Sequence, residues 1–228
     1  MVAVHKPVMT REVLSYLAVQ PGSRILDGTV GYGGHAQAIL EEADDIELLG
    51  IDRDRDALDA AGERLGGFGD RVRLMHGRYS AMQECLRDIG WDLVDGVLLD
   101  VGVSSAQLDR PERGFSFRYD APLDMRMDQN ARLTAATLLN TADQEELKRI
   151  FKAYGEERKA AQIARAVVHR RKERPWSRTK EFADLVTRIV GPPRHGSLPP
   201  PTRCFQALRI AVNDELAELQ RGLAAAVR

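Results

Sequence analysis

Short apolar runs that end in a polar residue recur through the first half of the chain. They cover residues 25–26, 48–51, 72–75 and 96–99, and they are followed by Asp27, Asp52, His76 and Asp100. Between them, apolar residues recur at helical spacing, as at Val13, Leu14 and Leu17. This alternation predicts an α/β fold, in which a parallel sheet carries helices on both faces and a ligand binds at the carboxyl ends of the strands.

The pattern changes from about Arg110. Residues 113–128 mix aromatic, arginine and acidic side chains without a helix or strand period, and such irregular segments are usually functional. Helical patterns then continue to the end, and the expected helices are one opened by a Thr141-x-x-Gln144 capping box and three over 157–171, 180–190 and 202 to about the terminus. We therefore expect a core at 1–109, an inserted helical domain at 110–201 and, at 202–228, a helix that returns to the core.

The first apolar run leads into a turn with four glycines, Asp27-Gly-Thr-Val-Gly31-Tyr-Gly33-Gly34-His35. Such a turn between a strand and a helix lets a ligand approach the backbone closely. The spacing is not the G-x-G-x-x-G of dinucleotide sites, and no G-K-[ST] of a P-loop follows. The pattern D-x-x-x-G-x-G-G is typical of S-adenosylmethionine-dependent methyltransferases. Another nucleotide site, or a purely structural turn, is the alternative.

Two of the other run ends, and one loop aromatic, are candidate ligand contacts. Asp52 lies about twenty residues past the turn, where open α/β sheets place an acid that accepts hydrogen bonds from ribose hydroxyls. It can instead cap the helix that begins near Asp54. Tyr79 can stack on an adenine or be a half-buried loop aromatic. Asp100 is expected at the mouth of the pocket, beside the reacting methyl group.

The net charge of −1 hides a local basic segment. Between residues 158 and 180, ten basic side chains, histidine included, are interrupted by the single acid Glu173. A one-sign stretch that contains Trp176 suits a phosphate backbone and one stacked base, and the alternative is a solvated helix end.

The remaining composition bounds the class of protein. Cys85 and Cys204 are few and far apart, which favours a reducing compartment without a disulfide framework or a zinc site. No apolar run approaches 18 residues and no signal-peptide pattern is present, so we expect a soluble, cytoplasmic protein with no membrane partner. No clustered metal ligands are visible, and no metal site is predicted.

Seven motifs in a fixed order carry a specific likeness that runs from the first residues to the last. They are His5-Lys-Pro-Val8, Asp27 to His35, Gly50-Ile-Asp-Arg-Asp54, Leu99-Asp-Val-Gly-Val-Ser-Ser-Ala-Gln107, Arg113-Gly-Phe-Ser-Phe117, Pro122-Leu-Asp-Met-Arg-Met-Asp128 and Thr202 to Glu215. Together they resemble the bacterial small-subunit ribosomal RNA cytosine-N4 methyltransferase family, also called MraW or RsmH. Members of that family continue past a helix like 213–228 into further strands.

The resemblance implies a class I (Rossmann-like) S-adenosylmethionine-dependent methyltransferase core with an inserted helical domain. It also implies methylation of the exocyclic N4 amine of one cytosine in the decoding region of 16S ribosomal RNA, with the small ribosomal subunit as partner. Position 79 is commonly Phe in the family. The expected cofactor contacts are Gly31, Gly33, Gly34, His35, Asp52, Tyr79, Asp100 and Gln107, and Asp100 is also expected to orient the amine.

The target base must leave its stack to reach the pocket. We expect the stretch from Phe115 to Arg126 to line the base entrance and the helical insertion to grip the RNA backbone. The predicted RNA contacts are Phe115, Arg118, Arg126, Arg170, Arg171, Lys172 and Trp176. Two other classes stay open, namely a nicotinamide-dependent dehydrogenase and a non-catalytic RNA-binding protein that has kept a methyltransferase shell.

Overall fold

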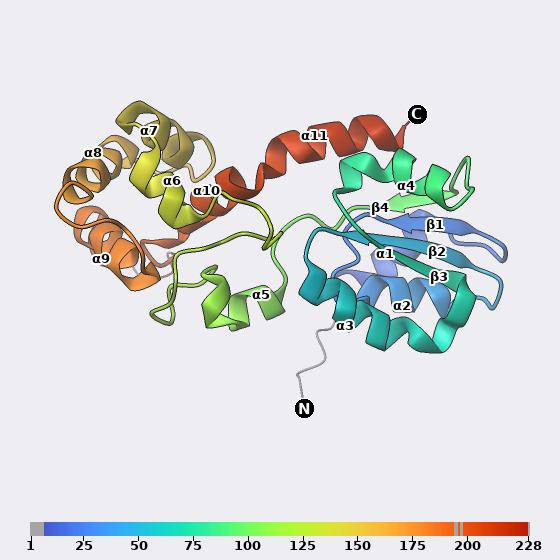
Figure 1. Cartoon of the computed structure of the whole chain (residues 1–228). Coiled ribbons are helices and arrows are strands. Elements are labelled where there is room, and N and C mark those ends of the chain that lie inside the picture. The colour runs from blue at the N-terminus through green and yellow to red at the C-terminus, as the bar shows by residue number, and fades with distance from the viewer. Residues whose placement is uncertain (1–6, 194–195, 197, 228) are drawn as a thin grey trace. The chain divides into compact units, whose positions relative to one another are not determined.

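The computed structural model describes residues 7–193, 196 and 198–227 (Figure 1). The chain forms two compact units, the first made of the residues up to Ser104 and those from Leu216 onward, and the second of 105–215. A compact unit need not be a domain that folds alone. The expected domain limits at residues 109 and 201 therefore stay a prediction. His5 and Lys6 of the first motif lie outside the described residues.

The first unit contains the predicted parallel sheet. Its strands are β1 (Arg24–Asp27), β2 (Glu47–Asp52), β3 (Val72–His76) and β4 (Gly96–Leu98), in the order β3-β2-β1-β4. Asp27 is in register with Gly50 of β2 and Leu98 of β4, and Asp52 with His76. The carboxyl ends of the strands therefore meet at one edge, as predicted, although β4 ends two residues before Asp100.

Helices cover both faces of this sheet because successive side chains of a strand point to opposite sides. Ile25 and Leu48 pack with α1 (Thr10–Leu17), α2 (Gly34–Leu40) and α3 (Arg55–Leu65). Leu26 and Leu49 pack on the other face, where the helices are α4 (Met82–Asp88) and α11 (Glu215–Ala226). Figure 1 shows α2 and α3 on one side of the sheet and α4 on the other. The predicted α/β fold is confirmed.

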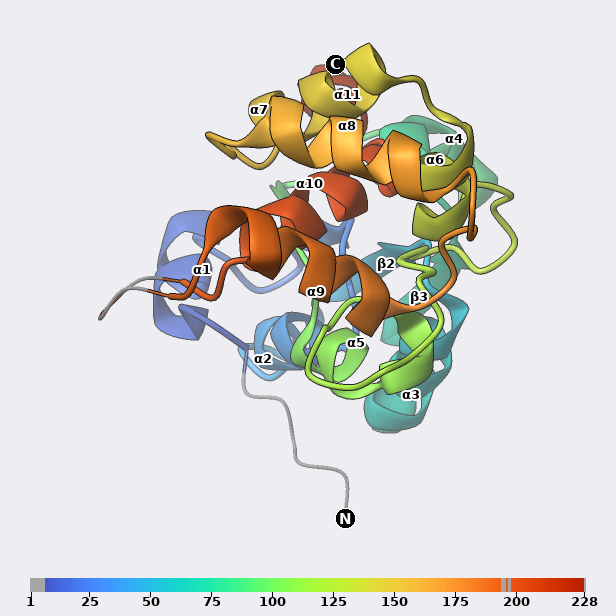
Figure 2. The same ribbon diagram turned by 90° about the vertical axis from the view of Figure 1, so that its left-hand side faces the viewer.

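The second unit is helical. Its helices are α5 (Ser105–Asp109), α6 (Ala135–Thr141), α7 (Gln144–Ala153), α8 (Ala160–Arg170), α9 (Thr179–Val190) and α10 (Thr202–Asn213), and α7 and α8 lie side by side (Figure 2). Short 3₁₀ turns are η1 (Gly66–Arg71) and η2 (Tyr79–Ala81) in the first unit and η3 (Pro111–Arg113) in the second. Phe182 lies at the centre of the helical core, 5.7–6.0 Å from the ring centroids of Phe151, Trp176 and Phe205.

Two predicted helix boundaries are wrong. Thr141 ends α6, where its hydroxyl donates to the Thr137 carbonyl, and α7 is capped instead by Asp143, which accepts from the backbone N–H of Glu146 at 2.8 Å. The expected single helix from Thr202 is two helices. The chain breaks at Asp214, whose φ of 52° is the left-handed conformation that Asp tolerates better than most residues.

Candidate functional site

The glycine turn has one open position, Gly31, and three that serve packing, among them Gly28, where an added Cβ atom would collide with Leu99 and Tyr79. Gly31 and Gly33 both have positive φ, 52° and 76°. A Cβ atom added to Gly31 would lie 3.7 Å from the Thr29 carbonyl oxygen, with no other described atom within 4 Å, chain neighbours aside. On Gly33 it would lie 3.2 Å from Leu65 of α3, and on Gly34 3.2 Å from Pro7. The backbone at Gly31 is thus free for a ligand to approach.

Asp52 fixes this turn from the neighbouring strand. One of its carboxylate oxygens accepts from the N–H of Gly31 and the other from the N–H of Asp54, each at 2.9 Å. Burial raises the pKa of Asp52. The helix cap is Asp54, which accepts from the N–H of Asp56. Because a carboxylate offers about four acceptor positions, two stay available to ribose hydroxyls, and the ribose role stays a prediction.

Asp27 is a site residue that the sequence interpretation used only as part of a motif. Its side chain is 1% exposed at the end of β1, and one oxygen accepts from the Thr29 N–H at 3.1 Å. Burial raises the pKa of Asp27 to about 7, against the lowering effects of the Thr29 bond and of His35, while the charges of Asp52 and Asp100 raise it further. The sequence signal for this burial is the position of Asp27, which lies between an apolar strand and a glycine turn.

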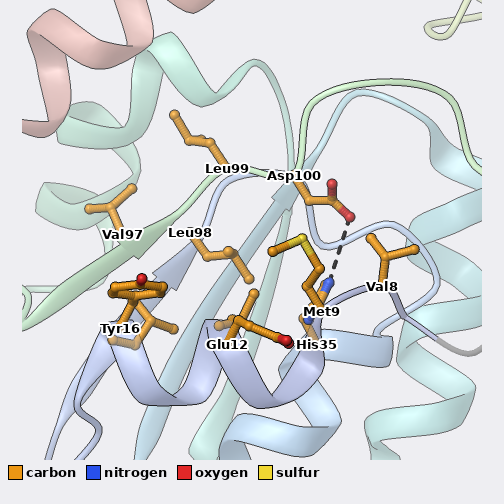
Figure 3. A pocket seen from close by; sticks show the side chains of 11 residues that line it. Val8, Met9, Glu12, Tyr16, His35, Val97, Leu98, Leu99 and Asp100 are labelled. Carbon is orange, nitrogen blue, oxygen red and sulfur yellow. Dashed lines mark ion pairs between the residues drawn. The ribbon is translucent and has the colours of Figure 1, made fainter.

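His35 and Asp100 meet at the mouth of the site. The Nε2 atom of His35, at the start of α2, lies 3.6 Å from a carboxylate oxygen of Asp100 (Figure 3). The His35 ring is buried, and its Nδ1 atom has no hydrogen-bond partner among the described residues. The backbone N–H of Asp100 donates to the Thr29 hydroxyl at 2.7 Å, which fastens the end of β4 to the glycine turn. The Asp100 side chain is half exposed.

A cavity of about 360 Å³ opens beside this pair. Figure 3 shows Met9 and Val8 near Asp100, and Glu12 and Tyr16 along α1. Most of the remaining lining is apolar and comes from α1 and residues 97–99, and Glu12 of α1 joins His35 and Asp100 as a polar lining group.

The other two predicted cofactor contacts are buried. Tyr79 is 5% exposed, and one edge of its ring lies directly against Gly222 of α11. Stacking of Tyr79 on an adenine stays a prediction, with one ring edge already covered. Gln107 is buried in the second unit, on α5, and its cofactor role likewise stays a prediction.

Trp176 cannot stack on a base from its place in the structure, which corrects that prediction. The side chain is 1% exposed and its indole N–H donates to the Val167 carbonyl. The ring meets Phe182 edge to face, and the Arg170 guanidinium lies 3.8 Å from the ring centroid. Phe115 is also buried, beneath Arg113.

Several predicted RNA-binding arginines hold the second unit together. Arg171 donates to the carbonyls of Leu139 and Ala142, at the end of α6. Arg126 pairs with Asp124 at 2.7 Å and donates to two loop carbonyls, while Arg170 pairs with Glu181. A run of like charges in the sequence does not show whether its side chains face RNA or donate to carbonyl groups of the protein itself. Arg118 and Lys172, in contrast, are exposed.

Three further observations concern the part of the chain that the structure describes. No helix there is both long and apolar enough to cross a bilayer. No group of three or more His, Cys, Asp and Glu side chains there is arranged to hold a metal ion. Cys85 and Cys204 are buried, free thiols, and burial raises the pKa of both.

The family model described as the MraW methylase family matches residues 2–228. Three similar relatives are each named ribosomal RNA small subunit methyltransferase H. The one from Geotalea daltonii is 51% identical over 98% of this chain and 72% of its own length. Those from Syntrophotalea carbinolica and Thermobifida fusca are 52% and 49% identical, over 96% and 98% of this chain and 70% and 69% of their own lengths.

The likeness to solved structures is much weaker. A methyltransferase from Thiobacillus denitrificans, in complex with S-adenosyl-L-homocysteine, is 18% identical with a TM-score of 0.31, over 75% of this chain and 86% of that one. It adds nothing to the family match.

Proposed function

Because the chain belongs to the MraW methylase family, a family of class I S-adenosylmethionine-dependent methyltransferases, we propose that it methylates the RNA of the small ribosomal subunit. The finer part of the proposal is the target, which is the exocyclic N4 amine of one cytosine in the decoding region. The partner is then the small subunit with its 16S RNA, in the cytoplasm.

The observation that carries the proposal is the open backbone at Gly31, fastened to Asp52. The residues present fit the cofactor. Asp52 keeps acceptor positions for ribose hydroxyls. The buried Nδ1 atom of His35 has no hydrogen-bond partner among the described residues, so a polar atom of the cofactor can supply one. The half-exposed carboxylate of Asp100 places a negative charge at the mouth of the site, which suits a cation. S-adenosylmethionine, when bound, supplies a methyl group on a positively charged sulfonium.

The reaction asks mainly for positioning. The lone pair of the cytosine amine is delocalised into the ring, so the amine is a weak nucleophile that must be held in line with the methyl group. Asp100 is the group for this task, because its half-exposed carboxylate lies at the mouth of the site and its backbone is held by Thr29. From there it accepts a hydrogen bond from the amine and can take up the proton that the amine loses.

The second unit supplies the RNA contacts in this proposal. Arg118 and Lys172 are exposed cations that can meet phosphates. Tyr119 is 56% exposed and follows Arg118 directly, so it replaces the buried Trp176 as the aromatic candidate for stacking on an unpaired base. Arg126, Arg170 and Arg171 act indirectly, by keeping the surface in shape.

The test is methyl transfer from radiolabelled S-adenosylmethionine to small subunits purified from cells that lack the modification. We expect label in one cytosine of the 16S RNA, recovered as N4-methylcytidine after digestion, and none in subunits that already carry the methyl group. Label in another nucleotide would contradict the finer proposal. RNA binding without any transfer at saturating cofactor would favour the non-catalytic role instead.

A further inference from the structure

One face of α11 is turned onto the segment 78–83, which contains Tyr79. Glu218, Gly222 and Ala225 lie on that face at positions i, i+4 and i+7. Glu218 accepts from the Ser80 backbone N–H at 3.0 Å, and the Ala225 carbonyl accepts from the Gln83 side chain at 3.1 Å. Gly222 leaves room for the Tyr79 ring, because any Cβ atom there would collide with it.

Glu218 is a charged group in a place where charge is costly. Its side chain is fully buried, yet Arg221 and Arg78 reach its carboxylate, at 3.1 and 3.7 Å. Burial alone raises the pKa of Glu218, but the hydrogen bonds from Ser80 and Arg221 and the charge of Arg53 outweigh it, so the pKa lies below its usual value. A buried ion pair seldom adds net stability, whereas it does fix the geometry of the groups that it joins.

Arg221 lies on α11 itself, whereas the other two cations near Glu218 belong to the two loops of the predicted adenosine site. Arg53 directly follows Asp52, and Arg78 directly precedes Tyr79. The His76 ring, at the end of β3, also lies 3.1 Å from the Arg53 carbonyl oxygen. Glu218 on α11 therefore holds the loop after β3, and the contact between His76 and Arg53 joins that loop to the loop after β2.

We propose that Glu218 is a positioning residue, which holds the 78–81 turn in the arrangement that receives the adenosine part of the cofactor. It acts through Ser80 and Arg78 and does not touch the cofactor. The proposal rests on the proposed function, since that function gives Asp52 and Tyr79 their ligand.

Isothermal titration calorimetry on the full chain tests this, with S-adenosylmethionine and 5′-methylthioadenosine as probes. In Glu218→Ala, loss of the charged acceptor weakens the affinity for both probes about 10-fold. In Glu218→Gln, the amide oxygen still accepts from Ser80, so the affinity falls about threefold. The matched control is Glu215→Ala on the same helix, which breaks a pair with Arg209 and leaves the affinity unchanged.

Two further readouts separate positioning from mere stability. The kcat at saturating cofactor changes less than about twofold in Glu218→Gln, because no group at the reacting centre is lost. Hydrogen exchange at 78–83 becomes faster in both Glu218 variants, and it stays as in the unaltered chain in Glu215→Ala.

The proposal is overturned if both Glu218 variants bind the probes as tightly as the unaltered chain, or if Glu215→Ala weakens binding as much as they do. Should Glu218→Ala fail to fold, the affinity of Glu218→Gln alone tests the proposal, because glutamine has nearly the same shape as glutamate. A chain that binds neither probe before any substitution would refute the proposed function together with this inference. Normal binding by the unaltered chain and by both Glu218 variants would refute this inference only.

Discussion

Replacement of Asp27 by Asn should change how the stability of the first unit depends on pH. The folded chain raises the pKa of Asp27 from its ordinary 3.8 to about 7, chiefly by burial. Because the folded pKa is the higher one, the protonated carboxyl group favours folding, and its contribution is complete below pH 4 and lost as the pH rises through 7. Each pKa unit is worth about 1.4 kcal/mol, so the total effect is at most about 4 kcal/mol.

Between pH 5 and pH 8, this linkage removes about 3 kcal/mol from the free energy of unfolding of the unaltered chain. In Asp27→Asn that loss is absent, since an amide does not ionise and its oxygen can still accept from Thr29. The two stability curves should therefore diverge as the pH rises. Urea unfolding measures them, with Trp176→Phe in both proteins so that Trp91 reports on the first unit.

The control for this experiment is Asp44→Asn, which neutralises an exposed carboxylate. Its stability curve should run parallel to that of the unaltered chain from pH 5 to pH 8. Parallel curves for Asp27→Asn as well would refute the reasoning, because they would mean that Asp27 titrates alike in the folded and unfolded states.

The remaining predictions concern the cofactor, the core and the RNA. Asp52→Asn should weaken S-adenosylmethionine binding about 10-fold or more in calorimetry, through loss of a charged acceptor, and unchanged affinity would remove Asp52 from the site. Trp176→Ala should destabilise the second unit by about 3–5 kcal/mol in chemical unfolding, and a loss of RNA affinity at unchanged stability would contradict its core role. Lys172→Ala and Arg118→Ala should each weaken RNA binding and lower the salt dependence by about one phosphate contact in filter binding, whereas an unchanged salt slope would exclude both residues from the interface.

The sheet was predictable because parallel strands covered on both faces are short, apolar runs, and because polar residues follow these runs at the sheet edge where open α/β folds generally bind ligands. Asp27, Asp52 and the glycine turn come from one such run and its neighbour. An open backbone in the turn could be expected, because glycine has no side chain. Which glycine stays open could not be predicted, since it depends on where Leu65 and Pro7 lie.

The sequence could not reveal partners that come from elsewhere in the chain. Arg171 and Trp176 looked like RNA contacts because their segment is basic, yet carbonyl groups and aromatic rings of neighbouring helices engage them. The contact between Glu218 and Ser80 spans 138 positions, and no local pattern marks it. The break at Asp214 lies within a continuous helical period, so only the backbone conformation shows it.

In the proposed function, the open backbone at Gly31 and the carboxylate of Asp52 receive the adenosyl group of the cofactor. A crystal of the chain soaked with S-adenosyl-L-homocysteine tests it most directly. We predict that the ribose hydroxyls lie within hydrogen-bond distance of Asp52 and that the ligand passes over Gly31. Density for the ligand at any other place, with the turn at residues 28–34 left empty, would contradict the account.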